Sequence, residues 1–343
     1  MAVYTTIDDP EAYFQVKIYT GDGNDDRALT FDGEENMQPD MCWFKERNST
    51  SSHAVYDAVR GVNKDLRPDT NATEATDAEL DALESFDSDG FTISDDGKVN
   101  QSASQTYVAW CWKESATAGF DIVSWTGNGS AQDISHSLSK VPTFIIVKNR
   151  DQADSWYCYN VHNGNTHSMI LDTDSAKVGA YTDNWNDTTP TTSVFSVGGS
   201  HATSGGSSEA MIAYAFTDIQ GFSKFGKYTG NGGTSGVDTA DGTFVYTGFR
   251  PAWVMIKRTD TANQWGIGDT KRDVDNPVQH HLFSESTQVE GGASSYNNFD
   301  ILSNGFKLRS GDLWTNASGG TYIFMAFAEA SFVNSNGVPC NAR

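Results

Sequence analysis

Tyr19-Thr20-Gly21-Asp22-Gly23 is the first of three similar motifs that organise this chain. It returns as Trp125-Thr126-Gly127-Asn128-Gly129 and as Tyr228-Thr229-Gly230-Asn231-Gly232. The first two threonines are 106 residues apart, and the second and third are 103 apart. A motif that recurs at a nearly constant period indicates a tandem-repeat architecture. The spacing predicts three repeats, each the size of one small domain.

Each copy of the motif is typical of a turn at the end of a strand. Residues 10–19 alternate in polarity, which predicts a half-buried strand that runs into the first turn. The glycines allow positive φ, and the Asp or Asn side chain caps its own backbone. A turn between modules therefore explains the motif without a functional role.

A second triplicated pattern predicts the central strand of each repeat. Pro39, Pro142 and Pro251 are each followed six residues later by a lysine, with four apolar residues just before that lysine. Proline favours the start or edge of a strand, so we expect each strand to begin after it. The continuous apolar run indicates that both strand faces are covered.

An aromatic ring stands eight residues after each of these lysines. The rings belong to His53, Trp156 and Trp265. We expect the two tryptophans to be core anchors, because large aromatic side chains dominate core burial. A sugar-stacking platform is the alternative.

The predicted fold is all-β, with three tandem antiparallel β-sandwich modules of one repeat design. Apolar strands near residues 107–112, 211–216 and 322–327 close the repeats. Residues 72–86 are interpreted as a short helical turn. The predicted modules are 1–124, which is the acidic one, 125–227 and 228–343.

The chain is strongly acidic, and its charge is unevenly distributed. It carries 23 Lys or Arg and 45 Asp or Glu, a net charge of −22. Residues 1–124 alone hold 25 acidic and 9 basic residues, a net charge of −16. Such a surface repels phosphate backbones, so we expect no nucleic-acid partner. A solubilising coat explains the charge, and cation binding is the alternative.

Export, membrane insertion and a cysteine framework are not expected. No run of 18 or more apolar residues is present. Residues 1–9 are acidic and lack the apolar core of a secretory signal peptide. The four cysteines include no CxxC pair, which argues against a disulfide framework and a zinc site.

Several motifs, mainly in the first repeat and at the C-terminus, carry a resemblance to a known family. They include Asp8-Asp9-Pro10, Met37-Gln38-Pro39-Asp40, Arg60-Gly61, Asp89-Gly90-Phe91 and Phe327-Ala328-Glu329. On these motifs the chain resembles the tandem-repeat, tail fibre-like virion proteins of tailed phages that infect marine bacteria. The second repeat departs from the pattern, because it lacks the Arg-Gly and Asp-Gly-Phe motifs.

The resemblance implies a non-enzymatic virion structural protein, made in the cytoplasm of the bacterial host. The favoured role is a tail fibre or adhesin that contacts other virion proteins and binds a host-surface glycan or outer-membrane receptor. Family analogy favours a homotrimer, whereas three similar modules could instead form a pseudo-threefold object within one chain. One alternative is a capsid decoration or tail-scaffold protein without receptor binding. A second alternative is a glycan-processing tail enzyme.

Catalytic motifs are not found in the sequence. The Gly-x-Gly of each turn does not continue into a dinucleotide-binding pattern, and neither GxxxxGK[ST] nor GxSxG occurs. The carboxylates are too numerous for a glycosidase pair to be chosen without a measured separation. We therefore assign no catalytic residue.

The candidate ligand-binding residues lie in loops that differ between the second and third repeats. They are Trp185, His280, His281 and Tyr296. Divergent loops on a shared scaffold often carry recognition, and an exposed aromatic ring can stack on a sugar. Burial of Trp185 under its own loop is the alternative. His280-His281 could form a metal site or lie in a solvated loop. The solvated loop is favoured, because the spacing matches no known zinc motif.

The first turn is the favoured candidate for a metal ion. Asp22, Asn24, Asp25 and Asp26 supply oxygen ligands of the kind that Ca²⁺ takes, but their spacing does not follow the EF-hand loop. No cofactor is expected, and Ca²⁺ at this turn is the alternative.

Overall fold

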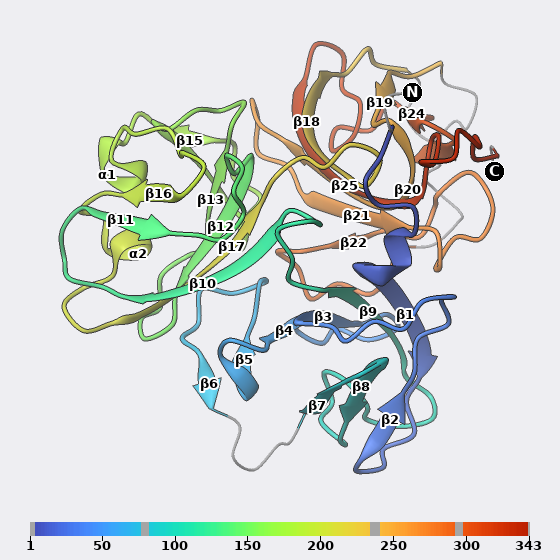
Figure 1. Cartoon of the computed structure of the whole chain (residues 1–343), viewed down its shortest axis with the longest axis horizontal. Coiled ribbons are helices and arrows are strands. Elements are labelled where there is room, and N and C mark those ends of the chain that lie inside the picture. The colour runs from blue at the N-terminus through green and yellow to red at the C-terminus, as the bar shows by residue number, and fades with distance from the viewer. Residues whose placement is uncertain (1–3, 77–81, 234–240, 292–297, 342–343) are drawn as a thin grey trace.

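Three groups of antiparallel sheets make up the protein. The computed structural model describes residues 4–76, 82–233, 241–291 and 298–341. Within them the chain is almost entirely β-strand, with two one-turn α-helices and one short 3-10 helix. Figure 1 shows the three groups around a common centre, in blue, green and orange-red along the chain. The all-β prediction is confirmed. No helix in the described ranges is long and apolar enough to cross a membrane.

The first group begins with a 3-10 helix and contains nine strands in the residues described. These elements are η1 (Pro10–Ala12), β1 (Phe14–Thr20), β2 (Arg27–Leu29), β3 (Met41–Glu46), β4 (Ala54–Asp57), β5 (Gly61–Leu66), β6 (Ala75–Thr76), β7 (Leu83–Asp87), β8 (Gly90–Ile93) and β9 (Thr106–Trp112). The large sheet has the order β1-β9-β3-β4-β5-β6, and the small sheet has the order β2-β8-β7.

The second group has two short helices among its strands. Its elements are β10 (Phe120–Thr126), β11 (Gln132–Ser135), β12 (Phe144–Asn149), β13 (Tyr157–Asn160), β14 (His167–Ile170), β15 (Val178–Gly179), α1 (Thr182–Trp185), β16 (Val194–Val197), α2 (His201–Ser204) and β17 (Ala210–Phe216). The large sheet has the order β10-β17-β12-β13-β14-β15, and β11 pairs with β16.

The third group also has one large and one small antiparallel sheet. Its elements are β18 (Ser223–Thr229), β19 (Phe244–Tyr246), β20 (Phe249–Arg258), β21 (Trp265–Asp269), β22 (Leu282–Phe283), β23 (Phe299–Leu302), β24 (Gly305–Leu308) and β25 (Thr321–Ser331). The large sheet has the order β18-β25-β20-β21-β22, and the small sheet has the order β19-β24-β23.

The three large sheets pair their central strands in the same register, which defines equivalent positions. The residue two places after each proline, Met41, Phe144 or Trp253, lies opposite the last residue of the next strand. Those partners are Asp57, Asn160 and Asp269. The closing strands match as well, with Trp112, Phe216 and Phe327 opposite the same three residues. These equivalences are used below to compare the contacts between sheets.

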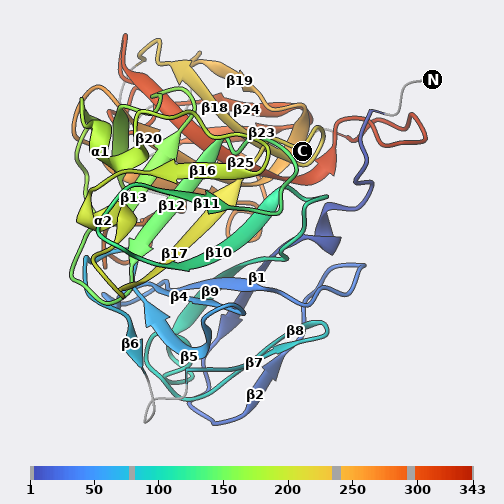
Figure 2. The same cartoon turned by 60° about the vertical axis from the view of Figure 1, so that its left-hand side comes forward.

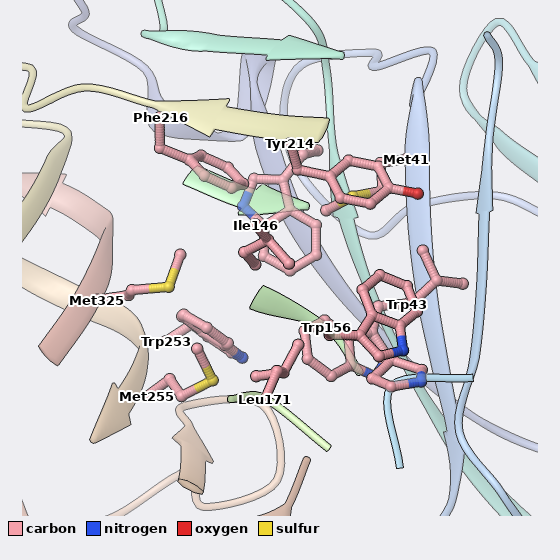
Figure 3. Close-up of a pocket in the computed structure, with 13 residues that line it drawn as sticks. Met41, Trp43, Ile146, Trp156, Leu171, Tyr214, Phe216, Trp253, Met255 and Met325 are labelled. Atoms are coloured by element: carbon pink, nitrogen blue, oxygen red, sulfur yellow. The ribbon is translucent and has the colours of Figure 1, made fainter. Parts of the chain in front are cut away.

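The large sheets face one another across a shared apolar core. One continuous cluster of buried side chains includes Trp43, Ile146 and Met255, which occupy equivalent positions in the three sheets. Figure 3 shows such side chains from all three sheets turned toward one small cavity. The cavity volume is about 20 Å³, and apolar side chains line it. A water molecule in this cavity would need two or more polar partners, and the lining is apolar. The centre therefore serves packing rather than ligand binding.

The predicted core anchors also join neighbouring sheets. Trp156 and Trp265 are 1% exposed, which confirms the core interpretation, and His53 at the equivalent position is also buried. Trp156 Nε1 donates to the carbonyl of Arg67 at 3.1 Å, and Trp265 Nε1 donates to that of Ile170 at 2.9 Å.

His53 joins the first group to the third in the same way, because its Nε2 lies 3.0 Å from the Phe283 carbonyl. Its Nδ1 accepts a hydrogen bond from Trp43 Nε1 within the first group. Burial, with the nearby charge of Lys45, lowers the pKa of His53 to about 3, which keeps the ring neutral. We name the contacts between the large sheets after the groups that they join. Junction 1–2 joins the first and second groups, junction 2–3 the second and third, and junction 3–1 the third and first.

Most sequence expectations about strands are confirmed, with three differences. β20 begins at Phe249, before Pro251, and accommodates that proline at an irregularity in the ladder. The helical turn expected within 72–86 is wrong for both described parts, because Ala75–Thr76 forms β6 beside β5, and Leu83 with its neighbours forms β7 beside β8. Leu80 lies outside the described residues.

The third difference concerns the module boundaries, which stay a prediction. The predicted limit between residues 124 and 125 falls inside β10, and the limit between 227 and 228 falls inside β18. All seven residues of each strand pair with β17 or β25, so these strands belong to the sheet that follows them in the chain.

Candidate functional site

Trp185 is a core residue of the second group. Its side chain is 1% exposed, and Nε1 donates to Ser168 Oγ at 2.9 Å. The ring packs edge-on against Tyr159, with centroids 5.6 Å apart. The expectation of an exposed stacking ring is therefore wrong. Helix α1 turns the tryptophan inward beneath a loop whose polar composition suggested exposure.

The two histidines have separate environments. His280 Nδ1 lies 2.6 Å from Asp273 Oδ1, and its side chain is about one-third exposed. His281 is 8% exposed and packs against Phe283 and Trp314. Burial lowers the pKa of His281 from its ordinary value, which favours the neutral ring. Ligand binding by either histidine stays a prediction, and Tyr296 lies outside the described residues.

The acidic first turn is already occupied by protein contacts. Asp22 Oδ1 accepts from the backbone of Asn24, and Asp22 Oδ2 lies 3.3 Å from Arg27 Nε. Asp25 accepts from Ser94 Oγ at 2.7 Å, and Asp26 adopts a φ of 55°. Among the described residues, no group of three or more His, Cys, Asp or Glu side chains is placed to hold a metal ion. Calcium binding at this turn stays untested.

Junction 1–2 is closed by a buried chain of charges. Arg60 pairs with Asp57, and both side chains are fully buried. Arg60 also donates to Glu74 at 3.2 Å, and Arg150 of the second group donates two bonds to Glu74 at 2.7 and 2.8 Å. Burial opposes ionisation of Glu74, but the Arg150 bond and the Arg60 charge outweigh it and lower the pKa. Tyr214 of the second group completes the contact by donating to Asp57 at 2.6 Å.

Junction 3–1 is closed in the same way by equivalent residues. Arg272 pairs with Asp269 and donates to Glu290 at 2.9 Å, and Arg47 of the first group donates to Glu290 at 2.8 Å. Burial again opposes ionisation of Glu290, but the two arginines outweigh it and lower the pKa. Trp110 Nε1 donates to Asp269 at 2.9 Å. We call each Arg–Glu–Arg series an ion chain.

Junction 2–3 lacks an ion chain among the residues that the structure describes. The backbone identifies the equivalent positions, because the N–H of Glu74, Glu290 or Lys177 donates in each case across the junction. The accepting carbonyls belong to Arg150, Arg47 and Thr259. The places of the ion chain are thus held by Asn163, Lys177 and Thr259, and the place of Asp57 is held by Asn160.

An open cleft lies where the ion chain is missing. Its volume is about 420 Å³, and Asn163, Lys177 and Thr259 all line it, together with Lys227 and Tyr228 of β18. β18 is the edge strand of the third large sheet and lies on the side that faces the second group (Figure 1). We call this space the junction cleft.

A second cleft of about 330 Å³ shares His162, Lys227 and Tyr228 with the junction cleft, so the two clefts are neighbours, and we call them together the groove. Asp218 also lines the second cleft, where it pairs with Lys224 at 2.6 Å. His162 Nε2 contacts the carbonyl of Phe225 at 3.3 Å, which ties the second group to β18. Burial lowers the pKa of His162, and the charge of Lys227 adds to that effect. Figure 2 shows β18 and β19 stacked beside the second group, seen from another side. The groove therefore combines cations, hydroxyls and aromatic side chains between two sheets.

The three lysines that follow the prolines stabilise the fold and do not line the groove. Lys45, Lys148 and Lys257 are fully buried, and each donates to backbone carbonyls, including one from the neighbouring group. Burial lowers the pKa of each to about 8. Their ammonium groups lie away from the groove and hold loops at the three junctions.

The comparisons with known proteins give a family but no activity. A search of curated proteins finds no match. Residues 9–331 match the model of a domain of unknown function, DUF7483. This match covers nearly the whole chain, and the chain belongs to the DUF7483 family.

Proposed function

We propose that this chain is a non-enzymatic structural protein of a phage virion, located at the tail and engaged in attachment to the host surface. The motifs that resemble tail fibre-like virion proteins support the phage assignment. The structural observation that carries the proposal is the single core shared by three large sheets. Such a block holds its outer loops and clefts in fixed positions, which is what a surface-binding module requires.

Localisation on the virion is the first test. Gold-labelled antibodies against the purified chain should decorate the tail of intact phage particles in negative-stain images. Labelling on the capsid lattice would replace the tail assignment by capsid decoration. Particles without label, after controls with a known virion protein succeed, would contradict the proposal.

Host attachment is the second test. Host cells incubated with the purified chain should adsorb fewer phages than cells incubated with an unrelated acidic protein of similar size. Unchanged adsorption at saturating protein would remove the attachment role and leave a scaffold. Release of oligosaccharides from host polysaccharide would instead favour the glycan-processing alternative.

A further inference from the structure

The junction cleft exists because residues of one junction differ from their equivalents at the other two. At junctions 1–2 and 3–1 a glutamate lies between two arginines, and the side chains of each ion chain are at most 20% exposed. At junction 2–3 the arginine positions hold Asn163 and Thr259, which are much shorter. The side-chain nitrogen of Asn163 is buried and has no hydrogen-bond partner among the described residues. This position therefore retains an unused donor beside the cleft.

At the junction cleft, the central position of the ion chain carries a positive charge instead of a negative one. Lys177 stands where Glu74 and Glu290 stand elsewhere, and Lys227 lines the same cleft. Neither lysine has an ion-pair or hydrogen-bond partner for its ammonium group in the described part of the chain, and both are exposed. Two unpaired cations in one cleft are notable in a protein of net charge −22. An anionic ligand group would take the place that a glutamate carboxylate has at the other junctions.

The remaining walls suit a hydroxyl-rich molecule. Three threonines of the third group, Thr229, Thr259 and Thr321, line the junction cleft. Beyond Lys227 the groove continues past Phe244 and Tyr246, which are 43% and 56% exposed. Hydroxyls that bond sugar hydroxyls, next to exposed aromatic faces that stack on sugar rings, are the usual elements of a saccharide site.

We infer that the junction cleft binds an acidic saccharide, with its carboxylate or sulfate group between Lys177 and Lys227 and its sugar rings along Tyr246. The choice of a saccharide among anions rests on the proposed attachment function. The position of the anionic group rests on the geometry of the junction alone.

The test is equilibrium binding to the purified full-length chain by affinity electrophoresis and titration calorimetry. The probes are a polyuronate, dextran sulfate and neutral dextran of similar length. We expect the polyuronate, dextran sulfate or both to bind, and neutral dextran to bind far more weakly. The two acidic probes distinguish a carboxylate ligand from a sulfate ligand.

Matched variants locate the site. Lys177→Gln and Lys227→Gln should each weaken binding about tenfold, as expected for the loss of one charge-assisted hydrogen bond. Lys140→Gln is the control, because Lys140 is exposed and lies outside the groove. It removes the same charge and should leave the affinity unchanged. Near-ultraviolet circular dichroism of each variant checks that the sheets remain packed.

The outcomes separate this inference from the proposed function. If neither acidic probe binds, or if the three variants lose affinity equally, the site is wrong. If cells still adsorb the chain in that case, the attachment proposal stands without this ligand. If acidic saccharides bind in the cleft but antibodies find no protein on the virion, the site stands and the proposed function fails.

Discussion

Junction 1–2 and junction 2–3 share one backbone hydrogen bond and differ in the side chains around it. The N–H of Glu74 bonds to the carbonyl of Arg150 at 2.7 Å, and the N–H of Lys177 bonds to that of Thr259 at 3.0 Å. The Glu74 carboxylate then ties Arg60 to Arg150, whereas the Lys177 ammonium has no such partner in the described residues. The same backbone frame thus supports either a junction closed by charges or an open cleft, and three side chains decide between them.

Removal of a buried carboxylate should break the closed junction most severely. Asp57→Ala leaves Arg60 charged and buried without its main partner, so we expect a loss of about 3–5 kcal/mol in the free energy of unfolding. Asn160→Ala is the matched change at junction 2–3 and should cost only about 1 kcal/mol, because a neutral hydrogen bond is lost. Urea unfolding at neutral pH measures both. Similar losses for the two variants would contradict the comparison.

The pH dependence of stability tests a carboxyl group beside junction 2–3. Glu285 Oε2 accepts from the backbone of Trp265, while Oε1 is buried without a partner in the described residues. Burial raises the pKa of Glu285 from 4.5 to about 7. The folded state therefore favours the protonated form, and this stabilisation is complete below pH 4.5 and lost as the pH rises through 7.

Glu285→Gln should remove this dependence. Relative to the native chain, the variant should gain about 2–3 kcal/mol in unfolding free energy between pH 4.5 and pH 8. Urea unfolding at the two pH values measures the difference. A constant difference across the range would show that Glu285 titrates normally.

Neutralising the central residue, Glu74 at junction 1–2 or Lys177 at junction 2–3, should change the free energy of unfolding by different amounts. Glu74→Gln keeps an acceptor but loses its charge toward Arg60 and Arg150, so we expect a loss of about 1–2 kcal/mol. Lys177→Gln should change the unfolding free energy by less than about 0.5 kcal/mol, because an exposed side chain without a partner is removed. Thermal unfolding at low and high salt compares them. A larger loss for Lys177→Gln would overturn the distinction.

Building an ion chain at junction 2–3 should close the cleft at little cost in stability. The quadruple variant Asn160→Asp, Asn163→Arg, Lys177→Glu and Thr259→Arg copies the ion chain of the other junctions together with the carboxylate that pairs with its first arginine. We expect its unfolding free energy to stay within about 1 kcal/mol of the native value, because desolvation of buried charges offsets their attraction. Its affinity for acidic saccharides should be lost. Retained affinity in a folded quadruple variant would place the ligand elsewhere.

The strands could be predicted well from the sequence, because the pattern of burial along a strand depends on residues that are neighbours in the sequence. The Pro-to-Lys pattern and the aromatic ring that follows it each lie within about 15 residues, and they become β3, β12 and β20 with their partner strands. The turn motif is equally local. Gly23, Gly129 and Gly232 adopt φ values of 67°, 73° and 78°, which glycine tolerates best.

The junctions could not be predicted from local pattern. Glu74 and Arg150 are 76 residues apart, and no periodic signal links them. For Trp185 the sequence left exposure and burial open, because the polarity of its loop does not fix the direction of its ring, and the structure shows burial. One signal was present, since the second repeat has Asn163 where the first and third repeats have Arg60 and Arg272. The missing arginine marks the open junction.

Hydrogen exchange at three backbone amides distinguishes a closed junction from an open one. The N–H groups of Glu74, Glu290 and Lys177 make equivalent bonds across the three junctions. We expect the Lys177 amide to exchange at least about tenfold faster than the other two, because its junction is not closed by charges. We also expect an acidic saccharide to slow exchange at Lys177 and to leave Glu74 and Glu290 unchanged. Equal exchange rates at the three amides, with or without the saccharide, would show that junction 2–3 is as closed as the other two and does not bind the saccharide.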